Sequence, residues 1–161
     1  MRQELIILGS GAHALAIQIL GNPDDAADAV QDALTTALAK PGRYDASKGH
    51  LKPWFLRVVR NRCIDLLRRR RPGDMGVDEL VDLAPNPEQA LAVTQRDRAL
   101  QRALASISTE QRQIIVLRDY LGLTYSEIAS VLDIAQGTVM SRLHRARLKL
   151  REVLTTYDDY E

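Results

Sequence analysis

The chain has 161 residues, of which 45% are hydrophobic, 27% charged and only 4% aromatic, a composition that predicts a soluble all-α protein of one ordinary or two small domains. The formal net charge of +1 conceals two basic blocks, residues 41–72 and 136–154, which indicate two contacts with a polyanion, although either block alone is also typical of solvated helix faces. The single Cys63 excludes an internal disulfide, no Cys/His cluster has metal-ligand spacing, and no apolar run reaches the roughly 20 residues of a membrane span, so we expect a cytoplasmic protein without metal, targeting segment or membrane insertion.

The first 40 residues contain the start and stop residues of two predicted helices. We expect a first helix over Ala12–Leu20, ended by Gly21. Asn22 is a good N-cap and Pro23 fits the first helical position, so a second helix is predicted from Pro23 to about Ala39.

The basic block 41–72 begins with a predicted loop over Arg43–Lys52, and Pro53 then opens a helix that reaches about Arg70. This helix is amphipathic, with an apolar face made by Phe55, Val59, Cys63, Leu66 and Leu67, Val58 at its margin, and Arg57, Arg60, Asn61 and Arg68 roughly opposite. One face is expected to pack while the other meets solvent or phosphate.

Residues 72–86 are rich in Gly, Pro and Asp, which predicts a flexible linker between two helical domains. Asn86–Pro87 can start a helix that runs to about Ala105. Ser108-x-x-Gln111 is typical of a capping box, and the helix that it starts is expected to end near Leu121–Gly122.

The last part of the chain has the pattern of a helix-turn-helix. A second capping box, Thr124-x-x-Glu127, introduces a helix to Leu132, and a final helix is predicted from about Gln136 to Leu154. Its inward stripe is Val139, Leu143, Ala146 and Leu150. The residues expected to contact DNA are Gln136, Thr138, Ser141, Arg142, Arg145 and Lys149. An ordinary helical hairpin with a solvated basic face is the alternative.

We assign Thr138, Ser141 and Arg142 to base or nearby backbone contacts. Arg145 and Lys149 are assigned to phosphates, because later turns of the helix move away from the groove floor.

Three segments resemble one protein family. Leu123–Ala129 followed by Gly137–Arg147 is similar to the C-terminal domain of extracytoplasmic-function (ECF) sigma factors. Asp24–Ala33 resembles the polymerase-binding helix of that family, and Arg43–Arg71 its promoter-melting and minus-ten-reading segment. These resemblances cover most of the chain in the order of the family.

The resemblance implies an N-terminal domain over residues 1–71, the linker 72–86, and a C-terminal domain over 87–161 that reads the minus-thirty-five element. It implies that polymerase is bound by Asp24, Asp28, Gln31, Asp32 and Thr35. It also implies that melting and minus-ten reading use Tyr44, Lys48, His50, Lys52, Trp54, Arg57, Arg60 and Asn61. The implied partners are the RNA polymerase core, promoter DNA and an anti-sigma protein.

Some of these residues have a second interpretation. Trp54 can stack on an unstacked base or pack over the domain edge, and His50 can contact a flipped base or be an ordinary surface histidine. Helix capping is the alternative for Asp24 and Asp25. The segment Met1–Gly11 is shorter than in the family and lacks aromatics, which suggests an incomplete first helix, and residues 31–39 also lack the expected aromatics.

The leading hypothesis is therefore a sigma factor that directs promoter recognition. It is not expected to be an enzyme or to carry a cofactor, because no nucleophile–base or metal constellation is evident. A stand-alone helix-turn-helix regulator that does not bind polymerase is the chief alternative, and a module whose basic faces bind acidic proteins is a third.

Overall fold

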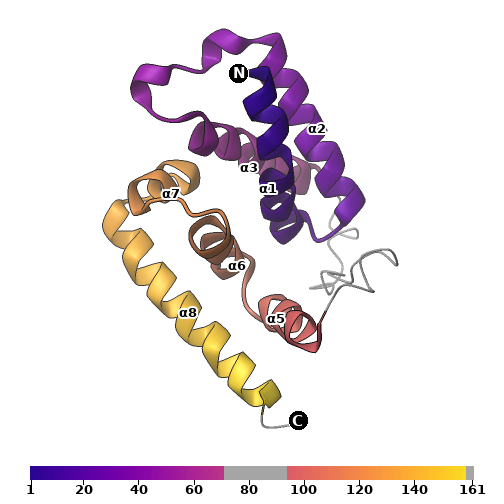
Figure 1. The fold of residues 1–161 in the computed structure, drawn as a ribbon, viewed down its shortest axis with the longest axis vertical. Coiled ribbons are helices and arrows are strands. Elements are labelled where there is room, and N and C mark those ends of the chain that lie inside the picture. Colours follow the sequence, from indigo (N-terminus) through magenta and orange to yellow (C-terminus); the bar gives the residue numbers. More distant parts are fainter. Residues whose placement is uncertain (71–93, 159–161) are drawn as a thin grey trace.

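The computed structural model describes residues 1–70 and 94–158, and every regular element within these ranges is a helix (Figure 1). The N-terminal half, residues 1–70, contains α1 (Arg2–Leu20), α2 (Pro23–Ala39), the 3-10 helices η1 (Pro41–Arg43) and η2 (Ala46–Lys48), and α3 (Leu51–Arg69). The C-terminal half, residues 94–158, contains α5 (Gln95–Ser106), α6 (Thr109–Ile115), the π-helical turn η3 (Val116–Tyr120), α7 (Tyr125–Leu132) and α8 (Gln136–Asp158). The expected all-helical fold with two helical domains is confirmed, whereas the linker predicted at 72–86 lies outside the described residues.

Helices α1, α2 and α3 pack on one another as a bundle whose core includes Leu5, Leu15, Phe55 and Val59, each fully buried. The expected start of the first helix at Ala12 is wrong, because α1 begins ten residues earlier and passes through the Gly9–Gly11 segment without a break. Burial of Leu5 explains the difference. A fully buried leucine stabilises by about 1.5–3 kcal/mol, which offsets the roughly 2 kcal/mol that two helical glycines, Gly9 and Gly11, cost relative to alanine.

Helix α1 also has the length and mean hydropathy, 1.3, of a membrane span, which the sequence analysis did not anticipate. Its buried residues, among them Ala12, Leu15 and Ala16, form part of the bundle core with α2 and α3. We therefore describe α1 as a core helix.

The predicted bounds of α2 are confirmed, whereas the predicted start of α3 is corrected. Helix α2 spans the expected residues, and the Asn22 side chain accepts hydrogen bonds from the backbone N–H groups of Asp24 and Asp25 at 2.8 and 3.1 Å. Helix α3 begins at Leu51, two residues before the predicted start. Pro53 is tolerated there because the first four N–H groups of a helix have no intrahelical partner.

The C-terminal half is organised by its caps. Thr94 is extended and caps α5 together with Asp97, so α5 does not continue from Pro87 as predicted, and the proposed cap at Asn86 lies outside the described residues. Both predicted capping boxes are confirmed, because the Ser108 and Thr124 hydroxyls each accept the N–H of the third helical residue at 3.1 Å.

Arg112 holds the turn between α5 and α6, although only 7% of it is exposed. Its Nη1 donates to the carbonyl of Ile107 at 2.8 Å and its Nη2 donates to the Thr109 hydroxyl at 3.0 Å. Because burial removes water from the guanidinium, the pKa of Arg112 is lowered. The side chain thus satisfies carbonyls that the end of α5 leaves without intrahelical partners.

Candidate nucleic-acid interface

Helices α7 and α8 form the helix-turn-helix that the sequence predicts. The turn between them is closed by Asp133 in the left-handed region (φ 56°) and by a hydrogen bond from the N–H of Ile134 to the carbonyl of Ala129 at 3.1 Å. Val139 and Leu143 are at most 1% exposed, and Leu150 is half-buried. The inward stripe is therefore confirmed, and it fixes which side chains of α8 face outward.

The residues expected to contact DNA lie along the solvent-facing side of α8. All are exposed except Thr138, which is half-buried: the exposed residues are Gln136, Ser141, Arg142, Arg145 and Lys149. The Ser141 hydroxyl donates to the carbonyl of Thr138 at 3.2 Å, which leaves its oxygen free to accept. Lys149 lies 3.7 Å from Glu152, but both side chains are more than half exposed, so this ion pair is weak.

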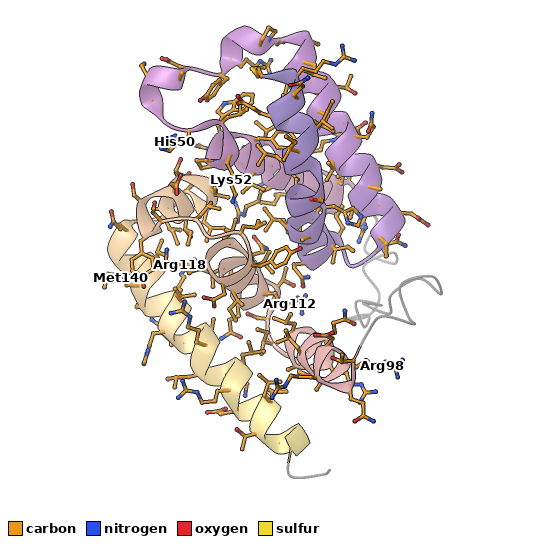
Figure 2. All side chains as sticks on the ribbon, in the orientation of Figure 1. His50, Lys52, Arg98, Arg112, Arg118 and Met140 are labelled. Carbon is orange, nitrogen blue, oxygen red and sulfur yellow. The ribbon has the colours of Figure 1, made fainter. Side chains whose placement is uncertain are left out.

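Two further exposed side chains of α8 were not anticipated. Met140 is 56% exposed and points away from the body of the molecule in Figure 2, and His144 follows it one turn later. An exposed apolar residue outside the inward stripe was the available signal for Met140.

Arg147 belongs to the same helix but contacts the protein. Its Nε donates to Oδ2 of Asp119 in η3 at 3.2 Å, and its Nη2 forms an ion pair with the same carboxylate. This hydrogen bonding raises the pKa of Arg147. Arg118 stacks 4.9 Å from the centre of the Tyr125 ring and donates to the carbonyl of Leu123 at 2.8 Å. These contacts hold α8 and α7 in position on η3.

The second basic surface begins at the loop between α2 and α3, and an aromatic pair orders this loop. The rings of Tyr44 and Trp54 lie 5.3 Å apart at 52°, and the Tyr44 hydroxyl donates to the carbonyl of Gly49 at 3.0 Å. Asp45 accepts from the backbone N–H and hydroxyl of Ser47 at 3.0 and 2.6 Å, which lowers the pKa of Asp45. Trp54 is half-buried against the core, as its packing interpretation requires, and its remaining surface is accessible.

The polar residues of this surface differ in accessibility. Four of them are exposed, namely Lys48, His50, Arg57 and Asn61. Lys52 and Arg60 are half-buried, because the C-terminal half packs on this side of α3. The prediction that Arg60 lies on an open face is therefore wrong. A helical wheel shows which face of α3 points away from the N-terminal core, but it does not show that the C-terminal half packs on that face.

The residues expected to bind polymerase lie on α2. Asp24, Asp28, Gln31 and Thr35 are exposed, and the Thr35 hydroxyl donates to the carbonyl of Gln31 at 2.9 Å. Asp32 forms an ion pair with Arg62 of α3 at 3.0 Å, so it also has a role within the bundle. Their binding role stays a prediction. Within residues 1–70 and 94–158, no group of three or more His, Cys, Asp or Glu side chains could hold a metal ion.

The chain matches two known families along its length. Residues 9–72 match Sigma-70 region 2, and residues 97–150 match Sigma-70, region 4. It is 34% identical over 152 residues to the ECF RNA polymerase sigma factor SigE of Mycolicibacterium smegmatis, covering 90% of this chain and 58% of SigE. It is 37% identical over 144 residues to the ECF RNA polymerase sigma factor SigM of Mycobacterium tuberculosis, covering 88% of this chain and 70% of SigM. The chain therefore spans somewhat more than half the length of these relatives.

Solved structures show the same architecture. The sigma factor RpoE from Bartonella quintana, in complex with the anti-sigma factor NepR, matches with a TM-score of 0.80 and 30% identity over 95% of both chains. CnrH in complex with the cytosolic domain of CnrY matches with a TM-score of 0.67 and 26% identity, over 96% of this chain and 86% of CnrH.

Proposed function

Because the chain belongs to the ECF family of RNA polymerase sigma factors, we propose that it binds core RNA polymerase and directs it to specific promoters. The main support for this proposal is that one chain carries two surfaces suited to binding DNA. One is the helix-turn-helix with its exposed polar face, and the other is the ordered loop with the basic helix that follows it. A melted strand needs both charge neutralisation and a surface for unstacked bases, and the second surface offers these.

We assign the minus-thirty-five contacts to α8, with Thr138, Ser141 and Arg142 near the bases and Arg145 and Lys149 on phosphates. Melting and minus-ten recognition are assigned to the loop and α3, where Lys48, His50, Arg57 and Asn61 are exposed and Trp54 presents part of its ring. These roles place promoter opening in residues 1–71 and upstream recognition in residues 87–161.

Polymerase binding is assigned to the exposed side of α2. Asp28, Gln31 and Thr35 lie beyond the first helical turn, so helix capping does not explain them. As a dissociable factor for polymerase the chain would act in the cytoplasm and would carry no catalytic group of its own. We also propose an anti-sigma protein as a partner, because the RpoE structure is a complex of that kind.

Binding to purified core polymerase tests this function. The full chain is expected to bind core, and Asp28→Ala with Gln31→Ala is expected to weaken that binding by about tenfold. Losing a hydrogen bond costs on the order of 0.5–1.5 kcal/mol, so two such losses reach about the 1.4 kcal/mol that corresponds to a factor of ten. Glu4→Ala removes an exposed carboxylate from α1 and serves as the matched control. A wild-type chain that does not bind core would instead favour the stand-alone regulator.

A further inference from the structure

The π-helical turn η3 connects α6 to the helix-turn-helix and differs from a simple continuation of α6. The N–H of Leu121 donates to the carbonyl of Val116 at 2.9 Å, which is one residue further back than the partner it would have in an α-helix. Single π-helical turns are rare and occur frequently at functional sites. The extra residue in this turn therefore needs a reason.

The turn directs two consecutive side chains at the helix-turn-helix while it keeps Leu117 fully buried. Arg118 lies 4.9 Å from the centre of the Tyr125 ring at the start of α7, and Figure 2 shows Arg118 on the side of α6 that faces α7 and α8. Asp119 reaches α8, where its carboxylate accepts from Nε of Arg147 at 3.2 Å and pairs with Nη2. Neighbouring residues of η3 thus hold the first and the second helix of the motif.

The contact between Asp119 and Arg147 lies where it can resist rotation of α8 about its own axis. Arg147 projects about 80° around the helix axis from the buried Val139, since each residue turns about 100°. Apolar packing of the inward stripe is non-directional, whereas two guanidinium nitrogens on one carboxylate form a directional contact. A rotation of about 15° would move atoms about 6 Å from the axis by roughly 1.5 Å, which is enough to break a hydrogen bond to a base.

Stability alone does not explain this ion pair. The side chains of Arg147 and Asp119 are 43% and 42% exposed, so solvent screens the pair and it adds little to the free energy of unfolding. Burial of Val139 and Leu143 already holds α8 on its domain. The pair also neutralises a cation that would otherwise attract phosphates, so its benefit is better explained by the orientation of α8.

We propose that Asp119 is a positioning residue for recognition of the minus-thirty-five element. Acting through Arg147, it fixes the rotation of α8 and so the direction in which Thr138, Ser141 and Arg142 face the base edges. Asp119 acts without touching DNA, and Arg147 contacts the protein rather than a phosphate. This inference rests on the proposed function, because the orientation of α8 affects recognition only if α8 reads DNA.

Holoenzyme binding to the cognate element and to single-base variants of it tests the positioning role through Arg147→Lys. Lysine keeps the charge but replaces the planar fork by a single ammonium group, so the two-nitrogen contact is lost. A good base contact gives roughly fivefold to 150-fold discrimination; we expect Arg147→Lys to reduce discrimination about fivefold. Arg151→Lys, the same substitution at an exposed position of α8, should leave discrimination unchanged.

Two further variants separate positioning from a phosphate contact. Arg147→Ala should lose as much discrimination as Arg147→Lys without lowering the slope of log affinity against log salt concentration, whereas loss of a phosphate contact would lower that slope by about 0.9. Asp119→Asn should also lose about fivefold, and Asp119→Asn with Arg147→Lys should be no worse than either alone, because the two residues share one interaction. Unchanged discrimination, a lower slope for Arg147→Ala or multiplied effects in the double variant would overturn the proposal.

Amide chemical shifts of the free chain test the same role without DNA. Asp119→Asn and Arg147→Lys should both shift the amides of Thr138 and Ser141, the nearer of which is about 9 Å from Arg147 along the helix axis. Unchanged shifts at both amides would overturn the positioning role, whatever the DNA result. A wild-type holoenzyme that does not discriminate between the cognate element and its variants would instead contradict the proposed function.

Discussion

The base and phosphate contacts assigned to different residues of α8 lead to a quantitative prediction. Arg142 is assigned to a base or its immediate surroundings, whereas Arg145 and Lys149 are assigned to phosphates. A lost phosphate contact should lower the slope of log affinity against log salt by about 0.9 and weaken all sequences equally. A lost base contact should instead cost about 1–3 kcal/mol on the cognate site and reduce discrimination against a changed base pair.

The exposure of Lys149 indicates that its full phosphate contact is available to DNA. Lys149 is 52% exposed and its 3.7 Å pair with Glu152 is solvated, so releasing it for DNA costs at most about 1 kcal/mol. Arg151→Ala is the matched control, because it removes an exposed cation from the same helix on nearly the opposite side from Lys149: two residues turn about 200° around the helix axis.

The assay is holoenzyme binding to promoter DNA at several salt concentrations, on the cognate element and on single-base variants of it. Arg145→Ala and Lys149→Ala should each reduce the slope, Arg142→Ala should reduce sequence discrimination, and Arg151→Ala should do neither. Equal behaviour of Arg142→Ala and Arg145→Ala would refute the assignment.

Three further predictions concern stability. Thr124→Ala removes the cap of α7 and should lower the free energy of unfolding by about 1 kcal/mol; an unchanged urea midpoint would contradict the cap. Arg112→Ala leaves buried carbonyls such as that of Ile107 without a donor, which should cost about 3 kcal/mol, whereas the exposed Arg102→Ala should stay within about 0.5 kcal/mol. Burial raises the pKa of Cys63 to about 12, so its thiol should react with an alkylating reagent only as fast as the N-terminal half opens. An unfolded thiol has a pKa of about 8.5, so the stability that comes from keeping the Cys63 thiol protonated in the folded chain should be complete below that pH and be lost as pH rises towards 12. Fast labelling of the folded chain at neutral pH would disprove the burial.

Local chemistry explains what the sequence predicted well. The caps at Asn22, Ser108 and Thr124 depend on atoms within three residues, and each forms the expected hydrogen bonds. The inward stripe of α8 follows from helical periodicity alone, so Val139 and Leu143 could be identified without a fold.

Contacts between distant residues explain what the sequence missed. Helix α1 continues through Gly9 and Gly11 because Leu5 is buried in a core made by two other helices. Arg60 looked free on a helical wheel, but its partner Gln113 is 53 residues away. The lack of space for a side chain at Gly11 likewise comes from Leu121, which no local sequence pattern connects to it.

Promoter opening tests the central claim most directly. The full chain is incubated with core polymerase and a cognate promoter, and unpaired thymines near the minus-ten element are detected by permanganate. We expect reactivity that requires both chain and core, together with protection of the minus-thirty-five element. Protection upstream without opening, or the same footprint in the absence of core, would contradict a sigma factor and support a stand-alone regulator.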